Sequence, residues 1–377
     1  MKKPKEVAVL IIGVFVFSTA ANAAKKMDAL PDTTASAIAI VNLDQQILQA
    51  GNEPGAEELL LVRSRYLGDY EALDRASRLS EGRFATVQDL LHRAHTRSAV
   101  HRFSDALTDL KAAEEMGAEA AEVQLSRASI LIATGHASEI IPELEKYERQ
   151  KPGYASKGAL AIAYATVGRL DEADRLYTAS LADLNTTLPF PYAWIYFARG
   201  LMWSEQGDNP ERAEAMYQKA LALVPEFVAA NINLAELEAA RGDNASAIKH
   251  LQHTARLSDE PEALALLGVL YKRTGRIAEG ERYILLARQR YEALLASYPL
   301  AFADHAAEFY LGPGADPERA WALARQNLAN RDTDRAVALA IKAAEASGHY
   351  NEACELLKRQ GPLVPVYLRN LERMIPR

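Results

Sequence analysis

Apolar residues recur along most of the chain at intervals of three and four positions, and short polar or glycine-containing stretches separate these runs. Leu267 and Tyr271 share one helix face before a turn at Gly275. Ile284 and Ala287 share another face after that turn. Such spacing is typical of amphipathic helices. It predicts a helix, a tight turn and a second helix, a unit that is too thin to bury its own apolar side and must pack against a neighbour.

The turn has counterparts along the whole chain. Spaced 33 to 39 residues apart, they are Gly68, His101, Gly135, Gly168, Gly207, Gly242, Gly275, Gly314 and Gly348. About five residues after most of them comes an alanine, namely Ala72, Ala106, Ala173, Ala213, Ala247, Ala320 and Ala353, with Ile140 and Gly280 in the other two places. A glycine can adopt positive φ and end the first helix. A small residue on the second helix lets two helices approach within about 8–10 Å. The spacing therefore predicts a series of similar hairpins.

This pattern resembles the tetratricopeptide repeat, whose period is 34 residues. The resemblance is clearest in "ALALLGVLYKRTGRIAEGERYILLA", "GALAIAYATVGRLDEADRLYTASL" and "ARGLMWSEQGDNPERAEAMYQKALALVP". In the last stretch the residues near the family's positions are Gly200, Gly207, Ala213, Tyr217, Ala220 and Pro225. The departures are His101 in place of a turn glycine and Gly280 in place of a helix alanine. The resemblance implies an all-α, right-handed superhelical solenoid of about nine helix-turn-helix repeats, with a concave inner face that binds partners.

The repeats divide the chain into four parts. Residues 55–360 form the solenoid, and residues 24–54 precede it with a capping helix expected in "SAIAIVNLDQQILQA". Residues 361–377, which include "LVPVYLRNLERMIP", are expected to cap the other end, where an apolar face must be covered. Two long gaps fall at "NTTLPFP" and around "YLGPGADPERAW", whose Pro and Gly residues predict loops or lengthened helices.

Residues 1–23 have the layout of a secretory signal peptide. Lysines precede an apolar run from Val7 to Ala20, and Ala21-Asn22-Ala23 follows it. The small residues favour cleavage after Ala23, and the run is short for a span of about 20 residues, the alternative being an uncleaved anchor. No cysteine follows the run, which argues against a lipoprotein anchor. We expect a bacterial periplasmic or secreted protein without a membrane span in its mature form.

Charge and cysteine content narrow the possible partners and chemistry. The formal net charge of −7 argues against a nucleic-acid or anionic-membrane surface, because both require a basic footprint. The single cysteine, Cys354, excludes an internal disulfide and thiolate metal clusters. Its place in "NEACELL" predicts a buried and unreactive thiol.

The first helix of each repeat lines the concave face in this family, and the register from the turn residues assigns the inner positions. The candidate partner-binding groove comprises Trp194, Phe197, Leu201, Ile232, Asn233 and Val269. Trp194, Phe197 and Leu201 form one helix stripe that either packs the "NTTLPFPY" insertion against the solenoid or anchors a partner segment. Some family members hold a C-terminal carboxylate with lysines and asparagines on successive inner helices. Here Asn233 and Lys272 are isolated, which puts that role in doubt.

The sequence contains no HExxH zinc helix, no phosphate-binding G-x-x-x-x-G-K-[ST] loop and no G-x-S-x-G elbow. His92 and His95 lie one turn apart on the expected inner face and are weak candidates for a metal site, because a third ligand is not evident. His250 and His253 repeat this spacing on an outer helix. The stretch "ADHAAEF" offers Asp304, His305 and Glu308 on one helix, most simply as ordinary surface or groove residues.

These observations predict a non-catalytic, exported scaffold without a cofactor that binds a protein or peptide segment in its groove. Its role would be the assembly, maturation or delivery of an exported complex. The alternative is a carrier of a small molecule or metal ion, using the groove or the His92/His95 pair. The third hypothesis is an enzyme with an unrecognised site, which is the least favoured because repeat solenoids mainly present binding surfaces.

Overall fold

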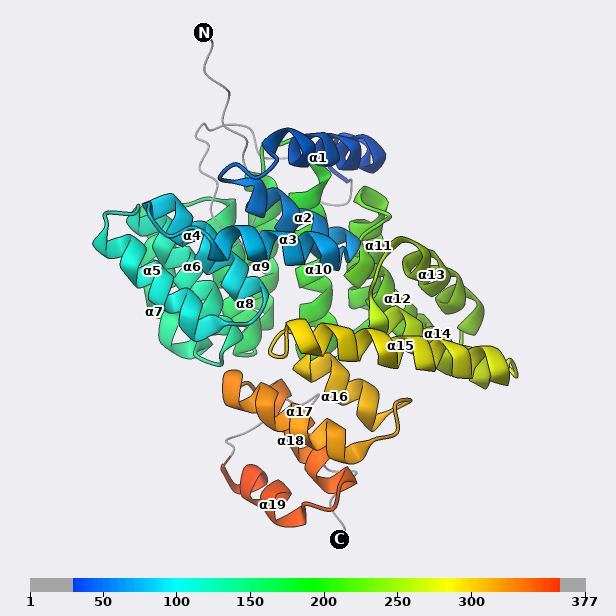
Figure 1. Ribbon diagram of the computed structural model, residues 1–377. Coiled ribbons are helices and arrows are strands. Elements are labelled where there is room, and N and C mark those ends of the chain that lie inside the picture. The colour runs from blue at the N-terminus through cyan, green and yellow to red at the C-terminus, as the bar shows by residue number, and fades with distance from the viewer. Residues whose placement is uncertain (1–29, 360–377) are drawn as a thin grey trace.

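The computed structural model describes residues 30–359, and every regular element within them is helical (Figure 1). The predicted signal peptide at 1–23 and the cap at 361–377 lie outside the described residues. The elements are α1 (Ser36–Ala50), α2 (Ala56–Leu67), α3 (Tyr70–Glu81), α4 (Val87–Ala99), α5 (Phe103–Glu115), α6 (Ala120–Ala133), α7 (Ala137–Gln150), α8 (Tyr154–Thr166), α9 (Leu170–Asp183), α10 (Pro189–Leu201), the π-helix η1 (Met202–Gln206), α11 (Pro210–Leu223), α12 (Val228–Ala240), α13 (Asn244–Leu257), α14 (Pro261–Arg273), α15 (Ile277–Ser297), α16 (Ala303–Leu311), α17 (Pro317–Asn330), α18 (Asp334–Ala346) and α19 (Tyr350–Arg359).

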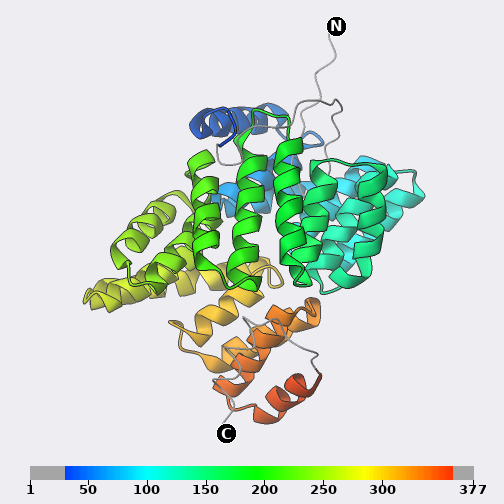
Figure 2. The same ribbon diagram turned by 180° about the vertical axis from the view of Figure 1, so that it is seen from behind.

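Successive helices pair as nine hairpins, from α2 with α3 to α18 with α19, and each hairpin packs on the next. The predicted fold class, an all-α solenoid of about nine repeats, is confirmed. The helices in the middle of the chain, green in Figure 2, stand side by side. No helix among residues 30–359 has the length and apolarity to cross a membrane.

Six of the predicted turn glycines have positive φ, and His101 adopts the same left-handed conformation with φ 57°. At Gly207 and Gly314 the left-handed residue is instead the next one, Asp208 or Ala315. These two turns are one residue longer. Their closing bonds run from Asn209 N to Trp203 O and from Asp316 N to Tyr310 O, whereas the ordinary turn closes from Arg276 N to Tyr271 O.

The two long gaps have different structures. The first consists of the loop at 184–188 before α10 and of η1 after it. The second lies in α15, which extends over 21 residues. The prediction that the second insertion surrounds "YLGPGADPERAW" was therefore wrong for most of the extra residues, because that stretch holds only the end of α16, a turn one residue longer than usual and the start of α17.

Helix α1 covers the stretch "SAIAIVNLDQQILQA" and packs Leu43 and Ile47 against the first hairpin. The prediction of a buried Cys354 was wrong, since its side chain is exposed. Ala353 is the buried residue of α19 at this point. The next residue lies about 100° further round the helix, which turns Cys354 toward solvent.

The superhelix winds far enough for its first turns to meet its last repeats, along a contact that we call the seam. Its N-terminal side consists of the turn residues Gly68, His101 and Gly135. Its C-terminal side consists of the segments 258–260, 298–302 and 330–333, which lead into α14, α16 and α18. In Figure 1 these C-terminal helices lie below the blue and cyan helices of the N-terminal repeats.

Hydrogen bonds join the two sides of the seam at each of these levels. Asp259 N donates to Gly68 O at 3.3 Å. The Nδ1–H of His101 donates to Leu300 O at 3.2 Å, and Asn330 Nδ2 donates to His101 O at 3.0 Å. Burial, followed by the charge of Arg331, lowers the pKa of His101 to about 4, which keeps the ring neutral. Histidine thus replaces a turn glycine because this position must bind a facing carbonyl.

Candidate functional site

The winding encloses a cavity of about 760 Å³. The first helix of every repeat except that of α8 contributes to its wall, together with η1. Seam residues close one side, among them Gly68, Tyr70, His101 and Phe302. The volume is in the range of about 300–1,000 Å³ that is usual for ligand pockets. This partly open cavity, bounded on one side by the seam, is therefore the candidate site.

The structure brings four of the predicted groove residues to this cavity, namely Phe197, Leu201, Ile232 and Asn233. Trp194 and Val269 are not among its lining residues. Trp194 is half-buried beside Phe197, with the Arg65 guanidinium 5.1 Å from its ring centroid.

The aromatic stripe contributes little to the cavity surface. Phe197 is only 5% exposed and packs on Phe227, with ring centroids 4.9 Å apart. Ile232 is 2% exposed. Asn233 donates to Ala229 O and accepts a hydrogen bond from Tyr217. These side chains belong mainly to the core behind the wall, and the cavity surface exposes both apolar and polar groups.

Charged residues on the wall are predominantly acidic. Its glutamates are Glu205, Glu236, Glu260, Glu262 and Glu308, its arginines are Arg65 and Arg335, and its histidines are His95, His101 and His305. No lysine or aspartate is among the lining residues. The excess of carboxylates makes the cavity attractive to cations.

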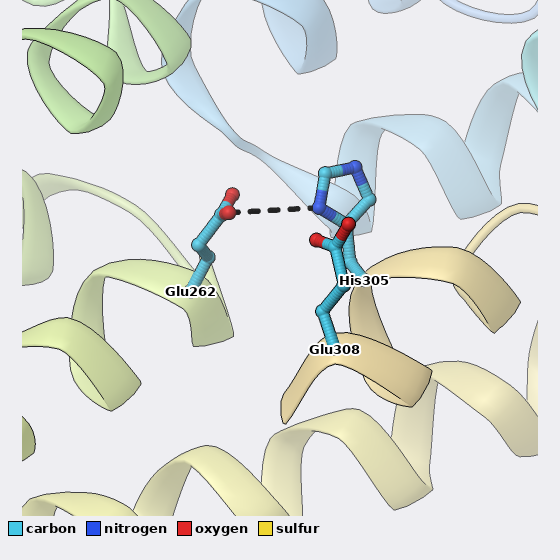
Figure 3. A group of neighbouring side chains, drawn as sticks. All are labelled: Glu262, His305 and Glu308. Carbon is cyan, nitrogen blue, oxygen red and sulfur yellow. Dashed lines mark ion pairs between the residues drawn. The ribbon is translucent and has the colours of Figure 1, made fainter. Parts of the chain in front are cut away.

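The acidic residues gather around His305, where α14 and α16 begin (Figure 3). One donor atom from each of Glu262, His305 and Glu308 lies within 4.8 Å of the others. His305 Nδ1 is 3.6 Å from Glu262 Oε1. Arg335, from α18, pairs with Glu308 at 3.2 Å and with Glu205 at 3.8 Å. His305 and Glu308 are three residues apart in α16, so their side chains lie on the same face of that helix.

Protonation in this cluster follows from enclosure and mutual charge. Enclosure favours a neutral imidazole, but Asp304 and then Glu262 raise the pKa of His305 well above its usual value. Enclosure likewise favours a neutral Glu262, yet the charge of His305 lowers the pKa of Glu262. Glu236 projects into the cavity, where the surrounding walls, followed by Glu262 and Glu308, raise its pKa to about 8.

The predicted pair His92 and His95 is placed differently. His95 reaches the cavity, but its two ring nitrogens already contact Glu58 Oε1 and Ser126 Oγ, each at 2.9 Å. His92 lies outside the lining and contacts Gln88 at 2.9 Å. A shared metal ion at this pair would have to displace these hydrogen bonds.

The sequence pattern placed His305 and Glu308 on one helix, but did not bring them near Glu262. It missed Arg335 and Glu205. The register could have placed Glu205 near the inner face, since it follows Leu201 by four residues. Nothing in the sequence indicates that Arg335 reaches both Glu308 and Glu205.

No protein-family model matches the chain, and no curated protein matches it in sequence. Solved structures share its architecture at low identity. A chain in the crystal structure of the APC/C hetero-tetramer Cut9-Hcn1 is 16% identical, with a TM-score of 0.48 over 88% of this chain and 66% of that chain. The human IFIT1 dimer with PPP-AAAA gives a TM-score of 0.46 at 16% identity, over 90% and 91%. PilW, titled a widely conserved type IV pilus biogenesis factor, gives 0.39 at 20%, over 55% and 92%. The present chain thus spans just under two thirds of the first of these, and no conclusion about function follows from such likeness.

Proposed function

We propose that this protein is a non-catalytic binding scaffold whose cavity takes a short segment of a partner protein that carries a lysine or arginine side chain. The observation that carries the proposal is the excess of five glutamates over two arginines on the wall. Both arginines already have partners, since Arg65 lies over Trp194 and Arg335 pairs with Glu205 and Glu308. A cationic group entering the cavity would meet Glu236 and Glu260, for which no ion pair is formed within residues 30–359, in a partly desolvated space where charges interact more strongly than in water.

Glu236 is the residue best placed to receive that group. Its side chain is exposed to the cavity, and no hydrogen bond or ion pair holds it within residues 30–359. Glu262 and Glu308 lie close enough to repel its charge. Binding a lysine or arginine there would relieve this repulsion and supply the missing hydrogen bonds. Charge-assisted hydrogen bonds of this kind are among the stronger ones in proteins.

The dimensions of the cavity favour a segment over a folded domain. An extended residue spans about 3.3–3.6 Å, so a volume of about 760 Å³ has room for a few residues. Phe197 and Ile232 present too little surface to act as apolar anchors. Recognition therefore depends on charge and on hydrogen bonds to groups such as Asn233 and Ser204, which line the cavity.

We further propose that the protein works after export, in the assembly, maturation or delivery of an exported complex. The support is the signal-like layout of residues 1–23 and the absence of the catalytic motifs sought in the sequence. Fractionation of bacterial cells that express the full chain, followed by N-terminal sequencing, tests the location. A periplasmic product that begins at Ala24 supports export, whereas an unprocessed cytoplasmic product contradicts it.

Binding to arrays of hexapeptides that vary every position tests the cavity. The wild-type protein should favour peptides with lysine or arginine. Glu236→Gln should weaken this binding roughly tenfold at a pH above the raised pKa of Glu236, as expected for one lost charge-assisted hydrogen bond. The control is Glu114→Gln, which removes the same charge from an exposed position of α5 outside the cavity.

Equal binding by the two variants, or a preference for neutral or acidic peptides, would refute the proposed ligand. Native mass spectrometry of the purified protein separates the rival carrier function. A small molecule that stays bound and is lost in Glu236→Gln would assign the cavity to a small cationic ligand instead.

A further inference from the structure

We propose that Glu262, His305 and Glu308 form a binding site for one divalent transition-metal ion, for which Zn²⁺ is the probe. This site goes beyond the proposed function, because it needs no partner protein. It also differs from the His92/His95 pair that the sequence suggested.

The three donors converge from two helices. Glu262 is in the first turn of α14, and His305 and Glu308 lie one turn apart on α16. Their donor atoms lie within 4.8 Å of one another. Ligands about 2.0–2.2 Å from a tetrahedral zinc ion are about 3.4 Å apart, so each donor needs to move by only about 1 Å. Figure 3 shows the Glu262 carboxylate facing the imidazole of His305, with the Glu308 carboxylate beside the ring.

The type of donor favours a transition metal. Imidazole nitrogen is a good ligand for zinc, iron and nickel, whereas calcium and magnesium prefer oxygen alone. One histidine with two carboxylates leaves at least one coordination position open toward the cavity. Water, or a group from a ligand in the cavity, could fill that position.

A further observation points to a missing ligand in this cluster. Nδ1 of His305 is buried and has no hydrogen-bond partner within the described residues. Its nearest acceptor, Glu262 Oε1, is 3.6 Å away, beyond hydrogen-bond distance. A bound ion would satisfy this nitrogen.

Charge balance agrees with a dication. Arg335 Nη2 contacts both carboxylate oxygens of Glu308, at 3.2 and 3.5 Å, so a bound ion would share this carboxylate with Arg335. With Glu236, Glu262 and Glu308 ionised and His305 neutral, one arginine and one divalent ion bring the cluster to neutrality. The ion would take over the compensation that charged His305 gives to Glu262 in its absence, because a metal-bound imidazole is neutral.

Isothermal titration of the full chain with Zn²⁺, after treatment with a chelator, is the direct test. We expect one ion per chain. His305→Gln and Glu308→Gln should each weaken binding at least tenfold. His136→Gln, which alters an exposed histidine outside the cavity, should leave binding unchanged. The melting temperature of each variant shows that it is folded. Co²⁺ as a second probe should give the intense visible absorption of a tetrahedral site in the wild type, and His305→Gln should abolish it.

No binding to the wild type, or unchanged affinity in both His305→Gln and Glu308→Gln, would overturn the assignment. So would loss of binding in His92→Gln with retention in His305→Gln, which would move the site to the other pair. A separate competition measurement tests whether the metal ion and the peptide of the proposed function bind to the same carboxylates. Because both cations would meet the same carboxylates, Zn²⁺ should weaken the binding of a lysine-containing hexapeptide. That measurement depends on the proposed function, whereas the titrations do not, so the two can fail independently.

Discussion

Gly135→Ala is the most direct test of the seam. Gly135 has φ 95°, and an ideal Cβ there would lie 2.0 Å from Asp332 O and 2.8 Å from the carbonyl carbon of that residue. Both atoms belong to the backbone, so no side-chain rotation relieves the contact. Gly242 offers a matched control, because its φ is 91° and its Cβ would meet nothing within 4 Å. The two substitutions share the local backbone penalty and differ in the contact across the seam.

The expected magnitudes follow from these geometries. A left-handed conformation costs alanine about 1–2 kcal/mol, which applies to both variants. Forcing extra atoms into a packed contact costs about 1–3 kcal/mol more, unless the seam opens. Urea unfolding should therefore show a larger loss for Gly135→Ala than for Gly242→Ala. If the seam opens instead, small-angle X-ray scattering should show a larger radius of gyration for Gly135→Ala alone. Equal stability and equal radii for the two variants would refute the seam.

Three other predictions concern packing, pH and reactivity. Gly268→Ala should destabilise the protein by about 1–3 kcal/mol in urea unfolding, because the added Cβ would lie 2.6 Å from Ile284 Cγ1. Gly158→Ala is the control and should not destabilise it, because the added Cβ would have its nearest contact at 3.6 Å, an ordinary van der Waals distance. Burial raises the pKa of Glu238 to about 7 from an ordinary value of 4.5. Between these values the native state binds more protons than the unfolded state, so stability should fall as pH rises. Glu238→Gln should remove this pH dependence, which amounts to at most about 3 kcal/mol in the free energy of unfolding. An unchanged pH dependence would contradict the raised pKa of Glu238. Cys354 should react with a thiol reagent in the native protein without a change in melting temperature, and protection until unfolding would show that it is buried.

The sequence pattern was sufficient for the fold because repeat structures depend on local signals. Helical spacing and turn residues recur in every repeat, so errors at single positions do not change the result. The misplaced second insertion shows where local signals fail. The extra residues within α15 lengthen a helix without a loop signal in the sequence. The Pro and Gly residues of the next turn are such a signal, so the insertion was assigned to them.

The site was predictable only in part, because it depends on the winding of the whole solenoid. Register assigned Phe197 and Ile232 to the inner face, but it could not show that these side chains are largely buried in the core behind the cavity wall. Glu262 and His305 lie 43 positions apart in the sequence, and no local pattern links them. Their approach requires the packing of α14 near α16, which no local pattern encodes.

The hydrogen bond from Asn330 to His101 joins residues 229 positions apart. Open solenoids contain only contacts between neighbouring repeats, so their folding can start at any repeat and spread. Contacts at such long sequence separation raise the contact order and slow folding, because a long loop must close before they form. The cavity therefore does not exist while the N-terminal repeats are being synthesised. It is completed only when residues near 330 have been added and the two ends of the coil have met.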